Sequence, residues 1–295
     1  MTTTTDLLRR AEIIDPFRVD GPTCISFSGG RTSAYMLWRV LQSNDGLPPD
    51  AVVCFANTGK EDEATLRFVR DCGQNWDVPI VWVEYRDDEH GYAVVDFDSA
   101  SRNGEPFAAI IAKRNYLPNP VTRFCTVELK IRTMHKYLKS LGWRELEDGW
   151  DQMVGIRADE HRRVVKIRAR PSPETAKETM ILPLADAGVT VHDVGEFWSK
   201  QPFNLELPTF NGRTLAGNCD LCFLKPAQQI ATLIAEKPER AIWWASMEAL
   251  ALASKPDGAV FRKDRPSYAA LLKFTQQQRD MFDSEEEAIA CFCGD

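Results

Sequence analysis

No hydrophobic run in the sequence is long enough to cross a membrane. The longest, residues 241–253, has 13 residues and includes Glu248, whereas a membrane-spanning helix needs about 20 apolar residues. The first ten residues carry threonines and Asp6 in place of the basic and apolar regions of a secretory signal. We therefore expect a cytoplasmic protein without a membrane partner, and we interpret residues 241–253 as a buried helix.

An excess of positive charge is also missing. The 36 Lys and Arg residues are outnumbered by 43 Asp and Glu residues, for a net charge of -7 at pH 7. Proteins that coat nucleic acid with their whole surface need Lys and Arg to neutralise phosphates, so this balance argues against that class and leaves room for a local basic patch. Internal repeats and low-complexity segments are absent too. The 295 residues, 44% of them apolar, are enough for a large core.

What the sequence does contain is an alternation of strand and helix patterns. Residues 23–27 form a β-prone run that enters a glycine turn, after which apolar residues recur at helical spacing. Residues 51–56 and 79–85 have the pattern of two further buried strands, with a helical face between them. This alternation predicts an α/β fold with a doubly wound, mostly parallel sheet that binds ligands at the carboxyl ends of its strands.

The remaining patterns divide the chain into three expected regions. These are an N-terminal extension at 1–20, an α/β core at 21–210 and a helical, cysteine-bearing region at 211–295. Residues 86–123 lack periodicity and contain several glycines and prolines, which predicts an irregular insertion with some helix. Other expected elements are a helix at 127–141, a strand at 152–156, an extended segment at 180–184, and helices at 191–198, 226–236, 238–253 and 267–281.

The first glycine turn has the composition of an anion-binding loop. It lies between a strand and a helix, where backbone N–H groups and the positive end of the helix dipole converge. Its spacing matches neither the Walker A pattern nor G-x-G-x-x-G. A tight turn with Thr32 as helix cap is the alternative, but a second loop at the end of the next strand favours a shared nucleotide crevice. The two loops comprise Ser28, Gly29, Gly30, Arg31, Thr32 and Ser33, and Asn57, Thr58 and Gly59.

Five motifs in chain order, spread over residues 21–225, resemble the phosphoadenosine phosphosulfate reductase family within the PP-loop ATP pyrophosphatase superfamily. They are Ser28-Gly29-Gly30-x-x-Ser33, Phe55-Ala56-Asn57-Thr58-Gly59, Arg123-Phe124-Cys125-Thr126 with Lys130, Gly155-Ile156-Arg157-Ala158-Asp159-Glu160-x-x-Arg163, and Leu182-Pro183-Leu184-Ala185-Asp186 leading to Asp193-Val194.

The resemblance implies an adenine nucleotide, either ATP or an adenosine phosphosulfate, at the carboxyl edge of the sheet. It places phosphate on the first loop, adenosine near the second, Lys130 beside the nucleotide, and Arg157 and Arg163 at the phosphates or sulfate. Many members of the superfamily carry Lys-Asp where this chain has Arg31-Thr32, and that aspartate is associated with Mg²⁺. Use of Mg²⁺ would therefore need a substitute carboxylate from residues 61–63, which are Glu61, Asp62 and Glu63.

Six basic residues lie within fourteen positions, from Arg157 to Arg170. Such a run fits a phosphosulfate group, an anionic partner such as nucleic acid, or the solvated face of a strand or hairpin. The family resemblance singles out Arg157 and Arg163, and we interpret the others as surface or nucleic-acid candidates.

The cysteines of the C-terminal region have the spacing of metal ligands. Cys219 and Cys222 form a C-x-x-C turn, and a zinc ion or a [4Fe–4S] cluster usually takes four protein ligands. The motifs make Cys125 the third candidate, and Cys291 or Cys293 the fourth. We expect a [4Fe–4S] cluster, with zinc or a redox dithiol as alternatives. The other three cysteines, Cys24, Cys54 and Cys72, fit small core residues.

Three functions remain open. The favoured one is a PP-loop enzyme that acts at the phosphate or sulfate of an adenine nucleotide, in sulfur transfer or thiolation with a sulfur donor. The second is a sulfonucleotide reductase in which Cys293 is the nucleophile and a thioredoxin-like protein the reductant. The third is a catalytically silent nucleotide-binding subunit with structural zinc. The sequence leaves open whether the chain forms a homo-oligomer.

Overall fold

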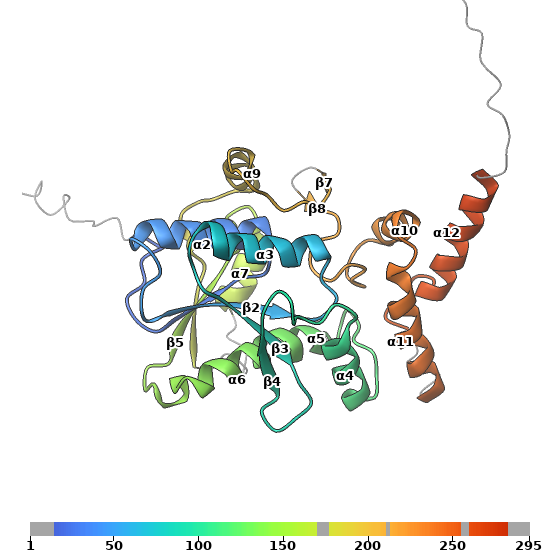
Figure 1. Cartoon of the computed structure of the whole chain (residues 1–295), viewed down its shortest axis with the longest axis horizontal. Coiled ribbons are helices and arrows are strands. Elements are labelled where there is room, and N and C mark those ends of the chain that lie inside the picture. Colours follow the sequence, from blue (N-terminus) through green and yellow to red (C-terminus); the bar gives the residue numbers. More distant parts are fainter. Residues whose placement is uncertain (1–14, 170–176, 211–212, 255–259, 283–295) are drawn as a thin grey trace, which may run out of the picture.

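The computed structural model describes residues 15–169, 177–210, 213–254 and 260–282 (Figure 1). Six strands form one sheet in the order β4-β3-β2-β1-β5-β6, and a separate pair, β7 and β8, forms a small ribbon. The strands are β1 (Thr23–Ser26), β2 (Ala51–Asn57), β3 (Ile80–Tyr85), β4 (Tyr92–Val95), β5 (Trp150–Val154), β6 (Glu178–Ile181), β7 (Thr209–Phe210) and β8 (Arg213–Thr214).

The large sheet is parallel except for its edge strand β4. Strand β1 lies at the centre, with Thr23 opposite Ala51 of β2 on one side and opposite Asp151 of β5 on the other. Strand β4 pairs antiparallel with β3. The predicted doubly wound, mostly parallel α/β fold is therefore confirmed, and the carboxyl ends of β1, β2 and β5 meet at one edge.

Helices cover both faces of this sheet. Those before the C-terminal region are α2 (Arg31–Ser43), α3 (Glu63–Asn75), α4 (Glu105–Arg114), α5 (Phe124–Thr126), α6 (Thr133–Ser140), α7 (His161–Ala169), α8 (Pro183–Asp186) and α9 (Val191–Ser199), with a π-helical segment η1 (Val127–Arg132) and a 3-10 turn η2 (Trp143–Glu145). Figure 1 shows α2 and α3 on one face and α6 on the other. A core cluster under α6 includes Cys24 and Cys54, and Cys72 is buried in the main cluster, as expected for small core residues.

Three local expectations were wrong. Residues 86–123 contain a strand, β4, as well as helix α4, because glycines such as Gly104 (φ 80) mark the ends of elements and do not prevent them. The helix expected at 127–141 is divided: its first part is η1, a π-helical turn of a kind that is frequent at functional sites. Within the basic run, residues 161–169 form the helix α7, whereas a strand or hairpin was the alternative considered; Arg170 lies outside the described residues.

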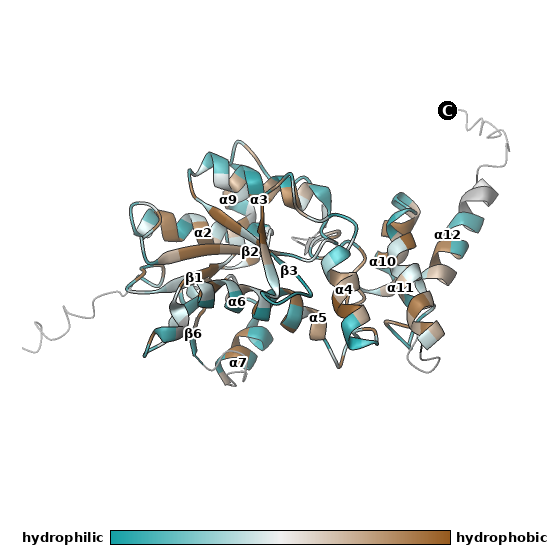
Figure 2. Ribbon diagram, turned by 60° about the horizontal axis from the view of Figure 1, so that its bottom comes forward, coloured by the Kyte–Doolittle hydropathy of each residue, from teal (hydrophilic) through white to brown (hydrophobic). Residues whose placement is uncertain are grey.

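The C-terminal helices α10 (Ala227–Glu236), α11 (Arg240–Ser254) and α12 (Tyr268–Phe282) lie beside the sheet domain, where the sequence predicts helices (Figure 2). Helix α11 buries one face, including Trp244 and Glu248, but Leu250 is 61% exposed. The prediction of a buried helix therefore holds for one face only. In the described ranges, no helix has both the length and the apolar character needed to span a bilayer.

Candidate functional site

The first loop is folded by its own hydroxyl groups. Ser33 Oγ accepts a hydrogen bond from the backbone N of Ser28 at 3.0 Å, lies 2.9 Å from Ser28 Oγ, and donates to the carbonyl oxygen of Gly30 at 3.0 Å. Gly30 is the N-cap of α2, and no side chain caps the helix. Thr32 is thus not a capping residue, and the first N–H groups of α2 remain available to an anion.

Two glycines allow the loop to pack against its neighbours. Gly29 has φ 73, and a Cβ there would lie 2.6 Å from Thr65 Cγ2. Gly155 follows β5, and a Cβ there would lie 3.0 Å from the Cα of Ser33. The backbone after β5 therefore touches the first loop directly, at a distance that only glycine permits.

The close contact between Gly155 and Ser33 also brings Arg157 to the first loop. Its guanidinium donates to Thr32 Oγ1 at 3.2 Å and to Asp159 Oδ1 at 2.8 Å. Arg163 has a different environment: its side chain is 62% exposed and pairs with Glu160. The structure thus joins one of the two expected arginines to the loop and leaves the other at the surface of α7.

The guanidinium of Arg31 binds protein groups. It donates to Asn204 Oδ1 at 2.7 Å, to Thr209 Oγ1 at 2.6 Å and to the carbonyl oxygen of Leu205. These residues belong to the segment of residues 204–210 and 213–217, here called the connector, which leads from α9 to the cysteine turn. The Trp198 indole also donates to the carbonyl oxygen of Arg31 at 2.9 Å. Arg31 therefore ties the connector to the start of α2.

The side chains of the second loop point into the protein. Asn57 is fully buried and donates to Glu84 Oε1 at 2.6 Å and to the carbonyl oxygen of Ser101 at 2.9 Å. Thr58 Oγ1 donates to Glu61 Oε2 at 2.8 Å. Gly59 has φ 77, and its carbonyl oxygen accepts from the N of Gly104 at 2.8 Å. The backbone N of Thr58 also donates to Glu61 Oε2 at 2.9 Å, and the N of Gly59 to Asn57 Oδ1 at 3.1 Å, so these contacts fix the shape of the loop.

The cysteine turn docks on the second loop. The N of Asp220 donates to the carbonyl oxygen of Lys60 at 2.7 Å, and the two side chains form a buried ion pair at 3.2 Å. The indole of Trp244, on α11, donates to Asp220 Oδ1 at 2.9 Å. Sequence reasoning did not single out this pair, since the only local signal was an aspartate between two cysteines. The pair joins the C-terminal helices to the α/β core.

Lys130 and three thiols gather at this contact. Lys130 Nζ lies 3.7 Å from Glu61 Oε1, and Thr58 Oγ1 lies 3.4 Å from Cys219 Sγ. Burial disfavours the charge of Lys130, but the Glu61 carboxylate and the neighbouring thiols outweigh it and raise the pKa of Lys130. Burial raises the pKa of Cys125 to about 11, with a smaller contribution from Cys222 nearby. The structure therefore brings Cys125, Cys219 and Cys222 around one lysine.

These thiols do not complete a metal site within the described ranges. No three His, Cys, Asp or Glu side chains there are grouped as a metal ion requires. Cys291 and Cys293 both lie outside the described residues. The structure therefore leaves the fourth ligand and the expected nucleophile as predictions from the sequence.

The three carboxylates considered for Mg²⁺ have other partners. Glu61 binds Thr58 and Lys130. Asp62 caps α3 and pairs with Arg240 at 2.6 Å, and Glu63 pairs with Arg102 at 2.7 Å. Position 32 carries a hydroxyl that accepts from Arg157, so an arginine lies at the place where an aspartate would favour Mg²⁺.

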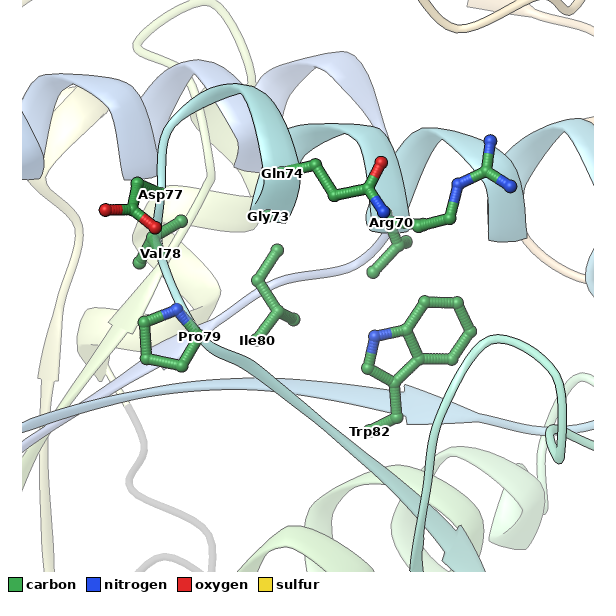
Figure 3. Close-up of a pocket in the computed structure, with 9 residues that line it drawn as sticks. Arg70, Gly73, Gln74, Asp77, Val78, Pro79, Ile80 and Trp82 are labelled. Carbon is green, nitrogen blue, oxygen red and sulfur yellow. The ribbon is translucent and has the colours of Figure 1, made fainter.

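Two hollows lie apart from the first loop. One, of about 450 Å³, lies between the C-terminal half of α3 and the start of β3, where Arg70, Ile80 and Trp82 line it (Figure 3). The other, of about 620 Å³, lies beyond the carboxyl end of β3 and is lined by Arg86, Ser101 and other residues. The first is at the amino end of its strand, on the side of the sheet opposite to the edge where parallel α/β folds bind ligands.

Comparisons with known proteins found similarities in sequence and in structure. No family model matches the chain. Two solved structures are loosely similar: a phosphoadenylyl-sulfate reductase from Candida auris in a phosphate complex (15% identity, TM-score 0.37, covering 69% of this chain and 82% of that one), and the U34-tRNA thiolase NcsA from Methanococcus maripaludis with its [4Fe-4S] cluster (14%, TM-score 0.35, 94% and 77%).

A closer relative comes from a bacteriophage. The uncharacterized nin region protein ORF290 of Escherichia phage lambda is 32% identical over 214 residues, which cover 70% of this chain and 67% of that protein. At this identity and coverage, the chain belongs to the family of the phage lambda nin region protein ORF290.

Proposed function

We propose that this protein binds ATP at the first loop and transfers its adenylyl group to an acceptor, as the activating step of sulfur transfer. One observation carries the proposal. Arg157 contacts the uncapped start of α2 through Thr32, and the cysteine turn contacts the second loop through Lys60; the two loops follow β1 and β2, which are neighbours in the sheet and end at the same edge. A phosphate site next to thiols is what adenylation followed by thiolation needs.

The reaction proceeds by two displacements. An oxygen of the acceptor attacks the α-phosphorus of ATP, and the bond to the bridging oxygen breaks, so that pyrophosphate leaves with its electron pair. A reduced sulfur nucleophile from a donor then attacks the activated carbon of the acceptor, and AMP departs with the acceptor oxygen. The N–H groups of residues 29–33 and the guanidinium of Arg157 stabilise the negative charge that develops on the phosphate oxygens. Arg31 positions the connector and does not touch the phosphates.

Substitution of Ser28 tests the first displacement. Ser28→Ala removes the hydroxyl that lies against Ser33 Oγ, and loss of one preorganised donor group typically costs about 10²-fold or more in rate. We expect release of labelled pyrophosphate from ATP to fall by roughly this factor. Ser199→Ala, at an exposed hydroxyl on α9 that binds the carbonyl oxygen of Glu196, is the control and should keep the wild-type rate. Equal rates in the two variants would contradict the proposal.

We include a [4Fe–4S] cluster in the proposal as a group bound in the cysteine region, without a role in the two displacements. Cys125, Cys219 and Cys222 would be three of its ligands, although in the described ranges these thiols are not grouped as a metal ion requires; no step above passes through the cluster. We expect anaerobically purified protein to be brown, with absorbance near 400 nm that is lost in Cys222→Ser. Colourless protein with stoichiometric zinc would contradict the cluster, and thioredoxin-dependent sulfite release that Cys293→Ser abolishes would favour a reductase instead.

A further inference from the structure

Helix α7 is short and packs little against the rest of the described protein. None of its nine residues is buried. Isolated helices shorter than about 12 residues are marginal in water, and most helical stability in proteins comes from packing of one face. A helix of this length that packs so little gains the most from a partner that covers it.

The charge of α7 is of one sign. Four of its nine residues are Arg or Lys, and none is acidic. Arg163 and Arg168 are paired with Glu160 and Asp186, whereas no carboxylate of the described residues pairs with Arg162 or Lys166. These two residues are four positions apart, so they lie on the same face of the helix. Val165, which is 65% exposed, stands beside them.

Helix α7 begins next to the proposed reaction site. Helix α7 begins four residues after Arg157, and the backbone between them is closed by a hydrogen bond from the N of Glu160 to the carbonyl oxygen of Arg157 at 3.1 Å. Arg157 in turn contacts Thr32 in the first loop. A molecule laid along α7 would therefore reach the edge of the sheet where the phosphates of ATP are proposed to bind.

We infer that the Arg162–Lys166 face of α7 binds the phosphate backbone of a nucleic acid, which carries the acceptor atom; this rests on the proposed function. The net charge of the whole chain is -7, so the chain as a whole does not attract a polyanion and binding would depend on a local cationic face. Two cations that no carboxylate of the described residues pairs with, on an exposed helix, suit a continuous row of phosphates. A single nucleotide would instead be held in a closed pocket.

Fluorescence anisotropy with a labelled 24-nucleotide RNA of mixed sequence, and with the matching DNA duplex, tests this inference. We expect at least one of them to bind at 50 mM KCl and to weaken steeply toward 200 mM. The double variant Arg162→Glu/Lys166→Glu should bind at least tenfold more weakly, and its slope of log affinity against log salt should be about two units shallower. The control is Lys237→Glu/Lys263→Glu, which makes the same change of charge at two exposed lysines of the C-terminal region and should bind like wild type.

Several results would overturn the inference. Wild-type protein that binds neither probe, or a double variant that binds like the control, removes the nucleic-acid site. Polyglutamate that competes as well as unlabelled oligonucleotide at equal charge points to an acidic protein instead. ATP binding, measured by calorimetry without oligonucleotide, separates the two hypotheses: its absence in wild type contradicts the proposed function, and its retention in the α7 variant shows that only the docking face has been lost.

Discussion

Gly29→Ala is expected to destroy the first loop and nucleotide binding together. Gly29 has φ 73, which costs an L-residue roughly 1–2 kcal/mol. Its new Cβ would also lie 2.6 Å from Thr65 Cγ2 and 3.2 Å from Phe55 Cε2, in the packed contact with α3. We expect the free energy of unfolding to fall by about 3 kcal/mol, measured by urea denaturation, and ATP binding to fall below detection.

The neighbouring glycine is a matched control. Gly30 has φ -108, and a Cβ there would approach nothing closer than Ser28 Oγ at 3.6 Å. The free energy of unfolding of Gly30→Ala should therefore lie within about 0.5 kcal/mol of the wild-type value. If both variants have the same stability, the loop does not have the conformation described, and the case for an anion site at the start of α2 is lost.

Arg31→Ala is expected to release the connector from α2. The substitution leaves Asn204, Thr209 and the carbonyl oxygen of Leu205 without their common donor. Hydrogen bonds from a charged group each contribute about 1.5–3 kcal/mol, and solvent can replace part of this at a half-exposed site. We expect a loss of about 3 kcal/mol in the free energy of unfolding, and faster hydrogen exchange at Leu215, whose N donates to the carbonyl oxygen of Pro208.

Two further variants distinguish a structural role of Arg31, in holding the connector, from a role in binding phosphate. Arg67→Ala removes a guanidinium that contacts the connector only through an exposed pair with Glu206 at 3.4 Å, so it should change stability by less than about 1 kcal/mol. Arg31→Lys should behave like Arg31→Ala, because an ammonium cannot reproduce the fork of donors. If Arg31→Ala loses ATP binding while Leu215 stays protected, Arg31 binds phosphate after all.

The fold could be predicted because its signals are local. The run before Ser28 and the helical spacing after Ser33 indicate a strand and a helix from neighbouring residues alone. The same reasoning did not find the helix at residues 161–169, for which a solvated strand or hairpin was considered and whose helix buries no face. A helix without a buried face has no hydrophobic periodicity that a sequence could reveal.

The candidate site was predicted in part for the same reason. The motifs indicated the two loops and the spacing of Cys219 and Cys222 indicated the cysteine turn, but Arg31 was counted among the residues of the anion-binding loop. In the structure the guanidinium of Arg31 donates hydrogen bonds to Asn204 and Thr209, more than 170 positions away in the chain. The partner of a long side chain depends on what the fold places beside it, and spacing along the sequence carries no information on that.

The sequence by itself determined the order of strands and helices, the glycine turn before α2 and the positions of the thiols, because each depends on residues close together in the chain. Only the tertiary structure decided that Gly155 touches Ser33, that Lys60 holds Asp220, and that Arg31 holds the connector. Each of these contacts joins segments that are distant in sequence, and their geometry follows from how the sheet packs its loops along one edge.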